Sequence, residues 1–314
     1  MVRDLRERPT LRRLKNRGRL AGLRFVAAAT GLIFLWSLLR QKFAFDLPPL
    51  DARLPGALGL VVLSFTCYAM RFGLVMRNGG LRLRTLQAWR ICAAAQFYQS
   101  LTPLSVGSDV TRFAMCRTAA PDLPPRSLVA AILLDHLVGS IALLVLALPF
   151  ARRHLFPTEL PDLALAGVGA GILGGVMLAW RFLPSRLREL RQTLSRHRRA
   201  TLSAVALSLV MHALLAGAVV MVAGLWQIPV RFSDVVGVLA CGALLQVVPV
   251  NLLGIHLGDA AGVGLYVLAG LHLPEAILLT SIAWSLRLVI ALIGGLWDMA
   301  SAARARRAAS AVRV

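Results

Sequence analysis

The sequence predicts an all-α polytopic membrane protein with about six full spans and two broken or re-entrant helical hairpins. Three observations support this prediction. The chain of 314 residues is 58% hydrophobic, well above the apolar share of a soluble domain. Several apolar runs reach the roughly 20 residues that cross a bilayer as a helix. Two further apolar runs are interrupted at their centres by proline, glycine and aspartate. We expect one transmembrane domain over 20–300, between basic tails at 1–19 and 301–314.

The full spans follow from uninterrupted apolar runs, which are long enough to cross the hydrocarbon core. The expected spans are 20–39, 55–76, 127–150, 163–183, 201–225 and 276–297. Arg24 and Arg71 lie near the ends of their spans, so we expect both side chains to extend to the membrane surface along their aliphatic stems. We assign 20–150 to a first half of the domain and 163–300 to a second half.

The first interrupted run covers 91–112. A helix that starts near Arg90 meets Pro103, which removes a backbone donor and clashes with the preceding turn. Gly107 and Asp109 then indicate a turn and a new helix with an acid in its first turn. Broken backbone at membrane depth is tolerated only where protein or a water-filled cavity covers it. The run therefore predicts a re-entrant helix beside a cavity; the alternative is a helix that ends at the membrane surface in a polar loop.

The second interrupted run covers 235–271, and each of its legs is shorter than a full span. The residues that interrupt it are Pro249, Asn251, Gly254, His256, Gly258 and Asp259. Both runs share the order proline, glycine, aspartate. Broken segments at matching places in two halves are typical of a binding site near the midplane, built from inverted repeats. We predict such an inverted repeat, although these residue types are common in any turn and the match could arise by chance.

The charge of the chain supports a membrane topology rather than a nucleic-acid partner. The formal net charge is +21, nearly all from arginine, and no soluble basic fold accompanies it. Basic loops remain in the cytoplasm. If 91–112 enters and leaves on one side, both termini and the basic loops 77–90 and 184–200 are cytoplasmic. The exception is the pair Arg152 and Arg153, which this topology leaves on the outer side.

Ionisable residues in or beside the apolar runs are the candidates for a binding site. A charge at the centre of a membrane helix raises the free energy of insertion by about 2.5–3.5 kcal/mol, so such groups are paired or face a water-filled cavity. In one interpretation Asp109 or Asp135 pairs with Arg112, and Asp259 pairs with Arg287, to hold the two halves together. In the other, compatible with the first, a polar cavity binds an anionic headgroup with arginines as phosphate clamps. The candidate substrate-binding residues are Gly107, Asp109, Arg112, Asp135, His136, Asn251, Gly254, His256, Asp259 and Arg287.

A proton relay by the adjacent Asp135 and His136 is a further interpretation. The sequence contains no Ser-His-Asp constellation on a suitable fold and no phosphate loop. Its four cysteines are scattered, without metal-ligand spacing. We therefore expect no catalytic residue, no metal, no cofactor and no enzymatic activity.

These motifs resemble those of a known family. The segment GSDVTR (107–112), preceded by LTPLSV, resembles the P-x-x-x-G-G-D-x-x-R signature of the flippase-like, lysylphosphatidylglycerol synthase transmembrane-region family. The segment 248–268 resembles the second signature of that family, and 285–296 resembles its last span. The chain departs from the pattern at Ser108, which replaces a glycine. It also departs at 254–259, which lacks the arginine of Gly-x-Gly-x-Arg-Glu and has a shorter acid, and at Asp135-His136, where the family often has Glu-Arg.

The resemblance implies a multi-pass protein of the bacterial inner membrane that acts in lipid translocation or envelope-lipid metabolism. We expect it to bind and flip an anionic phospholipid or a polyprenyl-phosphate-linked glycolipid, with Arg112 and Arg287 on the phosphate and Asp109 and Asp259 holding the broken helices. The lysylating domain of the two-part synthases is missing from the sequence, so no aminoacylation of lipid is expected. The alternative is a non-transporting accessory protein that presents lipid to a separate synthase or glycosyltransferase.

Overall fold

The computed structural model describes residues 51–101, 107–155, 198–246, 251–252 and 255–311. These residues form eight α-helices, a short 3₁₀ turn η2 (Gly224–Trp226) and one pair of two-residue strands. The predicted all-α class is confirmed. Four helices are long and apolar enough to cross a membrane, over Arg53–Asn78, Pro125–His154, Arg198–Trp226 and Leu273–Ser301. The expected spans 20–39 and 163–183 and the tail 1–19 lie outside the described residues.

The long helices are α2 (Arg53–Asn78), α5 (Pro125–His154), α8 (Arg198–Ala223) and α11 (Leu273–Ala311). Helix α5 begins with Pro125, whose fixed φ and missing N–H suit a first helical position. The start of α11 is closed by Glu275, whose carboxylate accepts a hydrogen bond from the backbone N–H of His272 at 3.0 Å. Gly270, with φ of 96°, makes the turn between α10 (Leu257–Leu268) and α11. Only glycine adopts such a φ without strain.

Both interrupted runs form pairs of short helices. The first pair is α3 (Thr85–Leu101) and α4 (Gly107–Ala119), with 17 and 13 residues. The second is α9 (Phe232–Leu245) and α10, with 14 and 12 residues. Both legs of the second run are shorter than a membrane span, as predicted, and so is α4, whereas α3 reaches the lower limit of that length. Between α9 and α10, β1 (Asn251–Leu252) and β2 (Ile255–His256) pair antiparallel, with Asn251 opposite His256. Pro103 and Pro249 lie outside the described residues.

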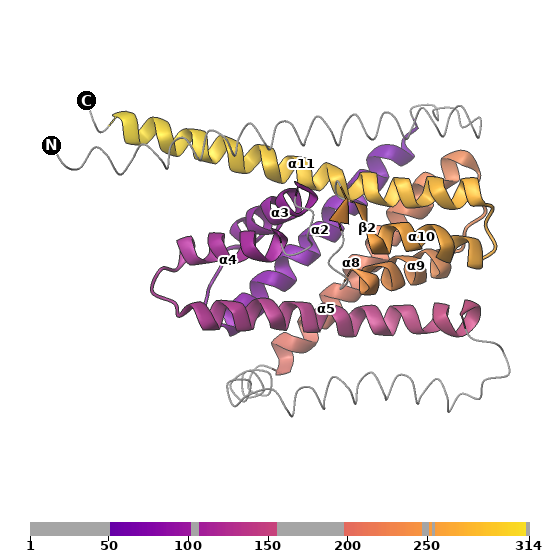
Figure 1. Ribbon diagram of the computed structural model, residues 1–314, viewed down its shortest axis with the longest axis horizontal. Helices are drawn as coiled ribbons and strands as arrows, with labels where there is room; N and C mark the ends of the chain where they lie inside the picture. The colour runs from indigo at the N-terminus through magenta and orange to yellow at the C-terminus, as the bar shows by residue number, and fades with distance from the viewer. Residues whose placement is uncertain (1–50, 102–106, 156–197, 247–250, 253–254, 312–314) are drawn as a thin grey trace.

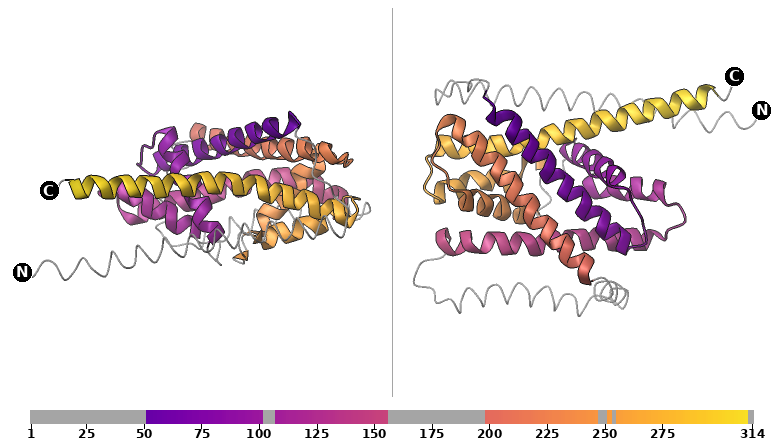
Figure 2. Two further views of the ribbon diagram at one scale, coloured as in Figure 1. Left: turned by 90° about the horizontal axis from the view of Figure 1, so that it is seen from above. Right: turned by 180° about the vertical axis from the view of Figure 1, so that it is seen from behind.

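The helices are arranged around the two hairpins. Helices α5 and α11 flank the bundle, and the hairpins α3/α4 and α9/α10 lie between them, entering from opposite ends (Figure 1). Helices α2 and α8 pack side by side in a layer across the bundle (Figure 2). As a result, the tips of the two hairpins point toward each other.

The contacts between helices repeat from one half of the chain to the other. Helix α3 packs on α11, as α9 packs on α5. Helix α4 packs on α5, as α10 packs on α11. Helix α2 contacts α3, α5 and α11, as α8 contacts α9, α11 and α5, and α2 packs on α8 itself. Each of the helices α2 to α5 therefore has a counterpart among α8 to α11 in the same surroundings.

The contact between α3 and α11 depends on the paired glycines of α11. A Cβ added at Gly294 would overlap the backbone of Ala93, and one added at Gly295 would overlap the ring of Phe97. The two helices therefore pack with their backbones in close contact, which fixes the first hairpin against the last span. Asp298 strengthens the same contact, because it accepts a hydrogen bond from the Tyr98 hydroxyl at 3.0 Å and lies 3.5 Å from Arg90.

Candidate functional site

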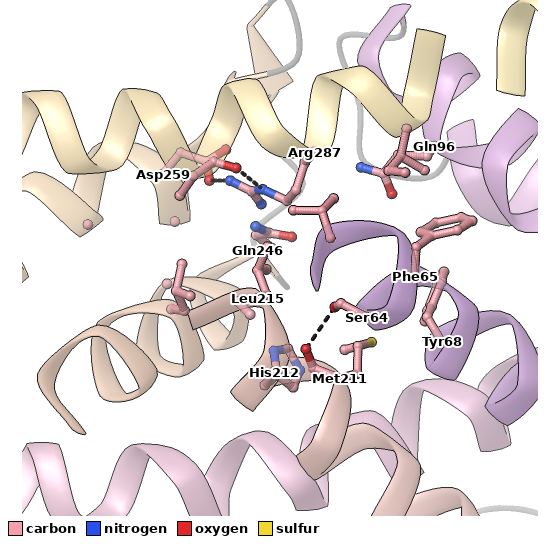
Figure 3. A pocket seen from close by; sticks show the side chains of 18 of the residues that line it. Ser64, Phe65, Tyr68, Gln96, Met211, His212, Leu215, Gln246, Asp259 and Arg287 are labelled. Atoms are coloured by element: carbon pink, nitrogen blue, oxygen red, sulfur yellow. Dashed lines mark hydrogen bonds and ion pairs between the residues drawn. The ribbon is translucent and has the colours of Figure 1, made fainter. Parts of the chain in front are cut away.

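A cavity of about 270 Å³ lies where the tips of the two hairpins meet. Figure 3 shows its walls, with side chains from α2, α8 and α11 facing one another across the space. One part of the wall is apolar and includes Phe65, Leu215 and Ile290. The polar lining residues are Ser64, Tyr68, Gln96, Gln99, Ser108, Arg112, His136, His212, Gln246, Asp259, Tyr266, Thr280 and Arg287. The cavity therefore combines a charged, hydrogen-bonding wall with an apolar wall.

A buried charge network joins α2, α4 and α5 beside the cavity. The Arg71 guanidinium donates two hydrogen bonds to the Asp135 carboxylate, at 2.9 and 3.0 Å, and a third to the Ser208 hydroxyl at 3.1 Å. Asp135 is 0% exposed and Arg71 is 5% exposed. The prediction that Arg71 extends to the membrane surface is therefore wrong. Its side chain turns into the bundle because α5 carries the buried Asp135 carboxylate at the same depth. Either charge would be strongly destabilising if it were buried without the other.

Arg112, the second arginine of this network, is held less tightly. Its Nη1 lies 3.6 Å from both Asp109 and Asp135, beyond normal hydrogen-bond length. The guanidinium lies over the rings of Tyr68 and Phe72, at 5.3 and 5.5 Å from their centroids. Its Nε is buried and has no hydrogen-bond partner among the described residues. Arg112 is thus a buried cation that lines the cavity with unused hydrogen-bonding capacity. The predicted proximity of Asp109 and Asp135 to Arg112 is confirmed.

Asp109 and His136 form a second contact between α4 and α5. His136 Nε2 lies 3.0 Å from both carboxylate oxygens of Asp109. His136 and Asp135 are neighbours in sequence, but they contact different partners, since Asp135 binds the two arginines. Gly107 begins α4 and so places Asp109 in the first turn of that helix, as predicted.

In the second half, Asp259 of α10 forms an ion pair with Arg287 of α11, which confirms the predicted pair. The prediction that these pairs hold the two halves together is wrong, because the partners of each pair belong to the same half. The Arg287 side chain is 27% exposed and faces the cavity, whereas Asp259 is 7% exposed. Asp109 and Asp259 occupy equivalent places, because each is the third residue of its helix. Their partners His136 and Arg287 follow at 27 and 28 residues along the chain. An acid–base contact therefore links α4 to α5 in the first half and α10 to α11 in the second half.

The structure places the remaining candidates less completely. The backbones of Asn251 and His256 pair between α9 and α10. Gly254 lies outside the described residues. Gly258, one of the residues that interrupt the second run, lines the cavity.

Two buried residues of the cavity wall were not predicted from the sequence. His212 Nδ1 and the Tyr266 hydroxyl are buried in the cavity wall without a hydrogen-bond partner among the described residues. His212 could have been found by the criterion that selected Asp135, because both are ionisable residues inside an apolar run. Tyr266 carried no such signal, because a tyrosine in an apolar helix is most often part of the core.

The fold and the site define a class of protein: a multi-pass helical membrane protein with a polar cavity between two broken hairpins. The family follows from comparison with known sequences. Residues 20–295 match the profile described as "Lysylphosphatidylglycerol synthase TM region", so the chain belongs to that family, as the motifs predicted. No match was found among curated proteins, nor among solved structures.

Proposed function

We propose that the protein binds the phosphate-bearing headgroup of an anionic lipid in the central cavity and translocates that lipid across the membrane. The main evidence for this proposal is the environment of Arg112 in the cavity wall. A buried cation whose Nε lacks a partner among the described residues has unused capacity to bind a ligand. The planar guanidinium matches the geometry of a phosphate, to which it donates two parallel hydrogen bonds.

The charges at the cavity wall favour an anionic group. Arg112 and Arg287 both line the cavity, whereas Asp135 is fully buried behind it and does not. Asp259 is the only acid among the lining residues described, and it is less exposed than its partner Arg287. A phosphate in the cavity would therefore have two guanidinium groups and one carboxylate around it, and Arg287 is the most exposed of the three.

The size of the cavity supports a headgroup rather than a whole lipid as the bound group. A volume of about 270 Å³ is at the low end of sites for small ligands. The acyl or polyprenyl chains would then remain in the bilayer while the headgroup moves through the protein. Anionic phospholipids and polyprenyl-phosphate-linked glycolipids both have a phosphate-bearing headgroup joined to apolar chains that can stay in the bilayer.

The repeated contacts of the two halves support access from both sides. Two hairpins that enter from opposite ends and meet at one cavity are the arrangement expected of an inverted repeat with a central site. Rocking of one half against the other would expose the cavity to each membrane face in turn. This role requires no catalytic residue, metal or cofactor, and we place the protein in the inner membrane with both termini in the cytoplasm.

Arg112→Gln is expected to slow lipid translocation at least about tenfold, the effect of losing one charge-assisted phosphate contact. Arg112 suits the test because its removal strands no acid: Asp135 keeps Arg71, and Asp109 keeps His136. The assay follows fluorescent phosphatidylglycerol across the membrane of liposomes that contain the purified protein. The control is Arg126→Gln, an exposed arginine that does not line the cavity.

Equal rates for the wild type, Arg112→Gln and Arg126→Gln would contradict the assignment of Arg112. If folded wild-type protein moves no anionic lipid at all, the accessory function becomes the better hypothesis. In that case a lipid synthase or glycosyltransferase should copurify with the protein.

A further inference from the structure

A second cavity, of about 490 Å³, lies at the end of the bundle where α5 ends and where α9 and α11 begin. We call it the end pocket and define it by Arg153, His154, Arg231, Asp234, His272 and Glu275, with Val230 and Leu271 on its apolar side. In Figure 1 these helix ends lie together at the right, away from the α3/α4 hairpin. The end pocket shares no lining residue with the central cavity.

Both acids of the end pocket already have partners within the protein. Asp234, in the first turn of α9, lies 3.3 Å from His154 Nε2. Glu275 accepts a hydrogen bond from the backbone N–H of His272, as described above. These two carboxylates therefore stabilise the ends of α5, α9 and α11, and neither forms an ion pair with an arginine of the pocket.

The two arginines of the end pocket have no acid partner among the described residues. Arg153 comes from the last turn of α5, and Arg231 immediately precedes α9. Both are exposed and line the pocket. The starts of α9 and α11 add the partial positive charge of two helix N-termini. Asp234 and Glu275, in the first turns of these two helices, offset this charge. The pocket thus presents two exposed guanidinium groups beside an apolar surface.

The position of the end pocket connects it with the central cavity. Asp234 of the end pocket and Val238 of the central cavity are one helical turn apart on α9. Gly270 and Tyr266 are likewise four residues apart at the end of α10. A headgroup that travels along the α9/α10 hairpin would meet both sites. The end pocket also gives a reason for Arg153, one of the two arginines that charge bias alone left on the outer side of the membrane.

We propose that the end pocket is a phosphate site that binds the headgroup of an anionic lipid at the membrane surface. Arg153 and Arg231 bind the phosphate, and Val230 and Leu271 contact the apolar part of the ligand. Binding at the end pocket stands on its own geometry. Its role as the place where a headgroup enters or leaves the translocation path rests on the proposed function.

The test measures binding of dihexanoyl-phosphatidylglycerol to the purified protein in detergent by native mass spectrometry. Dihexanoyl-phosphatidylcholine and inorganic phosphate serve as comparison ligands. The double variant Arg153→Gln/Arg231→Gln is expected to bind the anionic lipid at least about tenfold more weakly than the wild type, because two charge-assisted contacts are lost. The matched control is Arg152→Gln, which removes the same charge one residue away from a side chain that does not line the pocket. This control is expected to stay within about twofold of the wild type, as for an exposed surface charge.

All variants are also measured with Arg112→Gln, which removes the arginine of the central cavity and leaves the end pocket intact. If Arg112→Gln abolishes translocation while lipid binding still depends on Arg153 and Arg231, the two sites are separate. If inorganic phosphate binds as tightly as the lipid, and its binding also depends on Arg153 and Arg231, the phosphate site is confirmed and its ligand comes from solution. Equal weakening by Arg152→Gln, or no weakening by the double variant, would overturn the proposal.

Discussion

Asp135→Ala is expected to destabilise the folded protein by about 3–5 kcal/mol, the cost of breaking a buried ion pair by removing one partner. The substitution leaves Arg71 and Arg112, both buried, without the carboxylate that they share. Arg71 cannot move its charge to water without opening the contact of α2 with α5, whereas Arg112 lines the cavity and keeps Asp109 at 3.6 Å. The measurement is thermal unfolding of the purified protein in detergent, followed by size-exclusion chromatography of heated samples.

Two further variants make the Asp135 prediction specific. Asp122→Ala removes an exposed acid between α4 and α5 and is expected to leave stability within about 0.5 kcal/mol of the wild type. Adding Arg71→Met to Asp135→Leu removes the tightest pair as a whole and should recover part of the lost stability, because paired buried charges are often replaceable by apolar groups. A double variant less stable than Asp135→Ala would contradict this account of the network.

The sequence predicted the broken hairpins because proline, glycine and aspartate act locally. Pro103 and Pro249 each lack a backbone donor and are followed by glycine and aspartate, so the short legs of α3, α4, α9 and α10 could be predicted without tertiary information. Proline alone is not sufficient, because α5 continues through Pro149. The pairing of Asp259 with Arg287 was also predictable, because a charge in an apolar segment requires a partner and few were available.

The role of Arg71 depended on tertiary structure and could not be predicted in the same way. A position near the end of an apolar run is compatible both with a side chain that reaches the surface and with one that turns inward. Only the packing of α2 against α5 brings Asp135 within 3.0 Å and settles the direction. The same holds for His212 and Tyr266, whose places in the cavity wall follow from how α8 and α10 pack.

The two halves share their framework but differ at the residue that we assign to the phosphate. Arg112 follows Asp109 by three residues on α4, and Gly262 follows Asp259 by three residues on α10. Both Arg112 and Gly262 line the cavity. The equivalent acids therefore preserve the hairpin contacts, while the cavity carries an arginine on one side and, on the other, a glycine packed near Thr280 and Val238. If a headgroup binds in the cavity as we propose, this asymmetry would give it one preferred orientation.

Gly258→Ala is expected to destabilise the second hairpin by about 3 kcal/mol, at the upper end of the cost of overpacking. A Cβ at Gly258 would overlap the backbone carbonyl oxygen of Gly242 on α9, which cannot rotate away as a side chain could. The two helices would have to separate at the wall of the cavity, since both glycines line it. We therefore expect a lower melting temperature together with loss of lipid translocation.

Gly264→Ala on the same helix is the matched control for Gly258→Ala. A Cβ at Gly264 meets no atom within 4 Å, so the added methyl group costs no packing energy. Alanine inside a helix is favoured over glycine by roughly 0.5–1 kcal/mol, so this variant is expected to melt slightly above the wild type. Opposite shifts from the same chemical change, six residues apart on α10, would show that contact with α9 determines the effect. If Gly258→Ala melted as Gly264→Ala does, the close backbone contact of α9 and α10 would be wrong, and with it the wall of the cavity between the two hairpins.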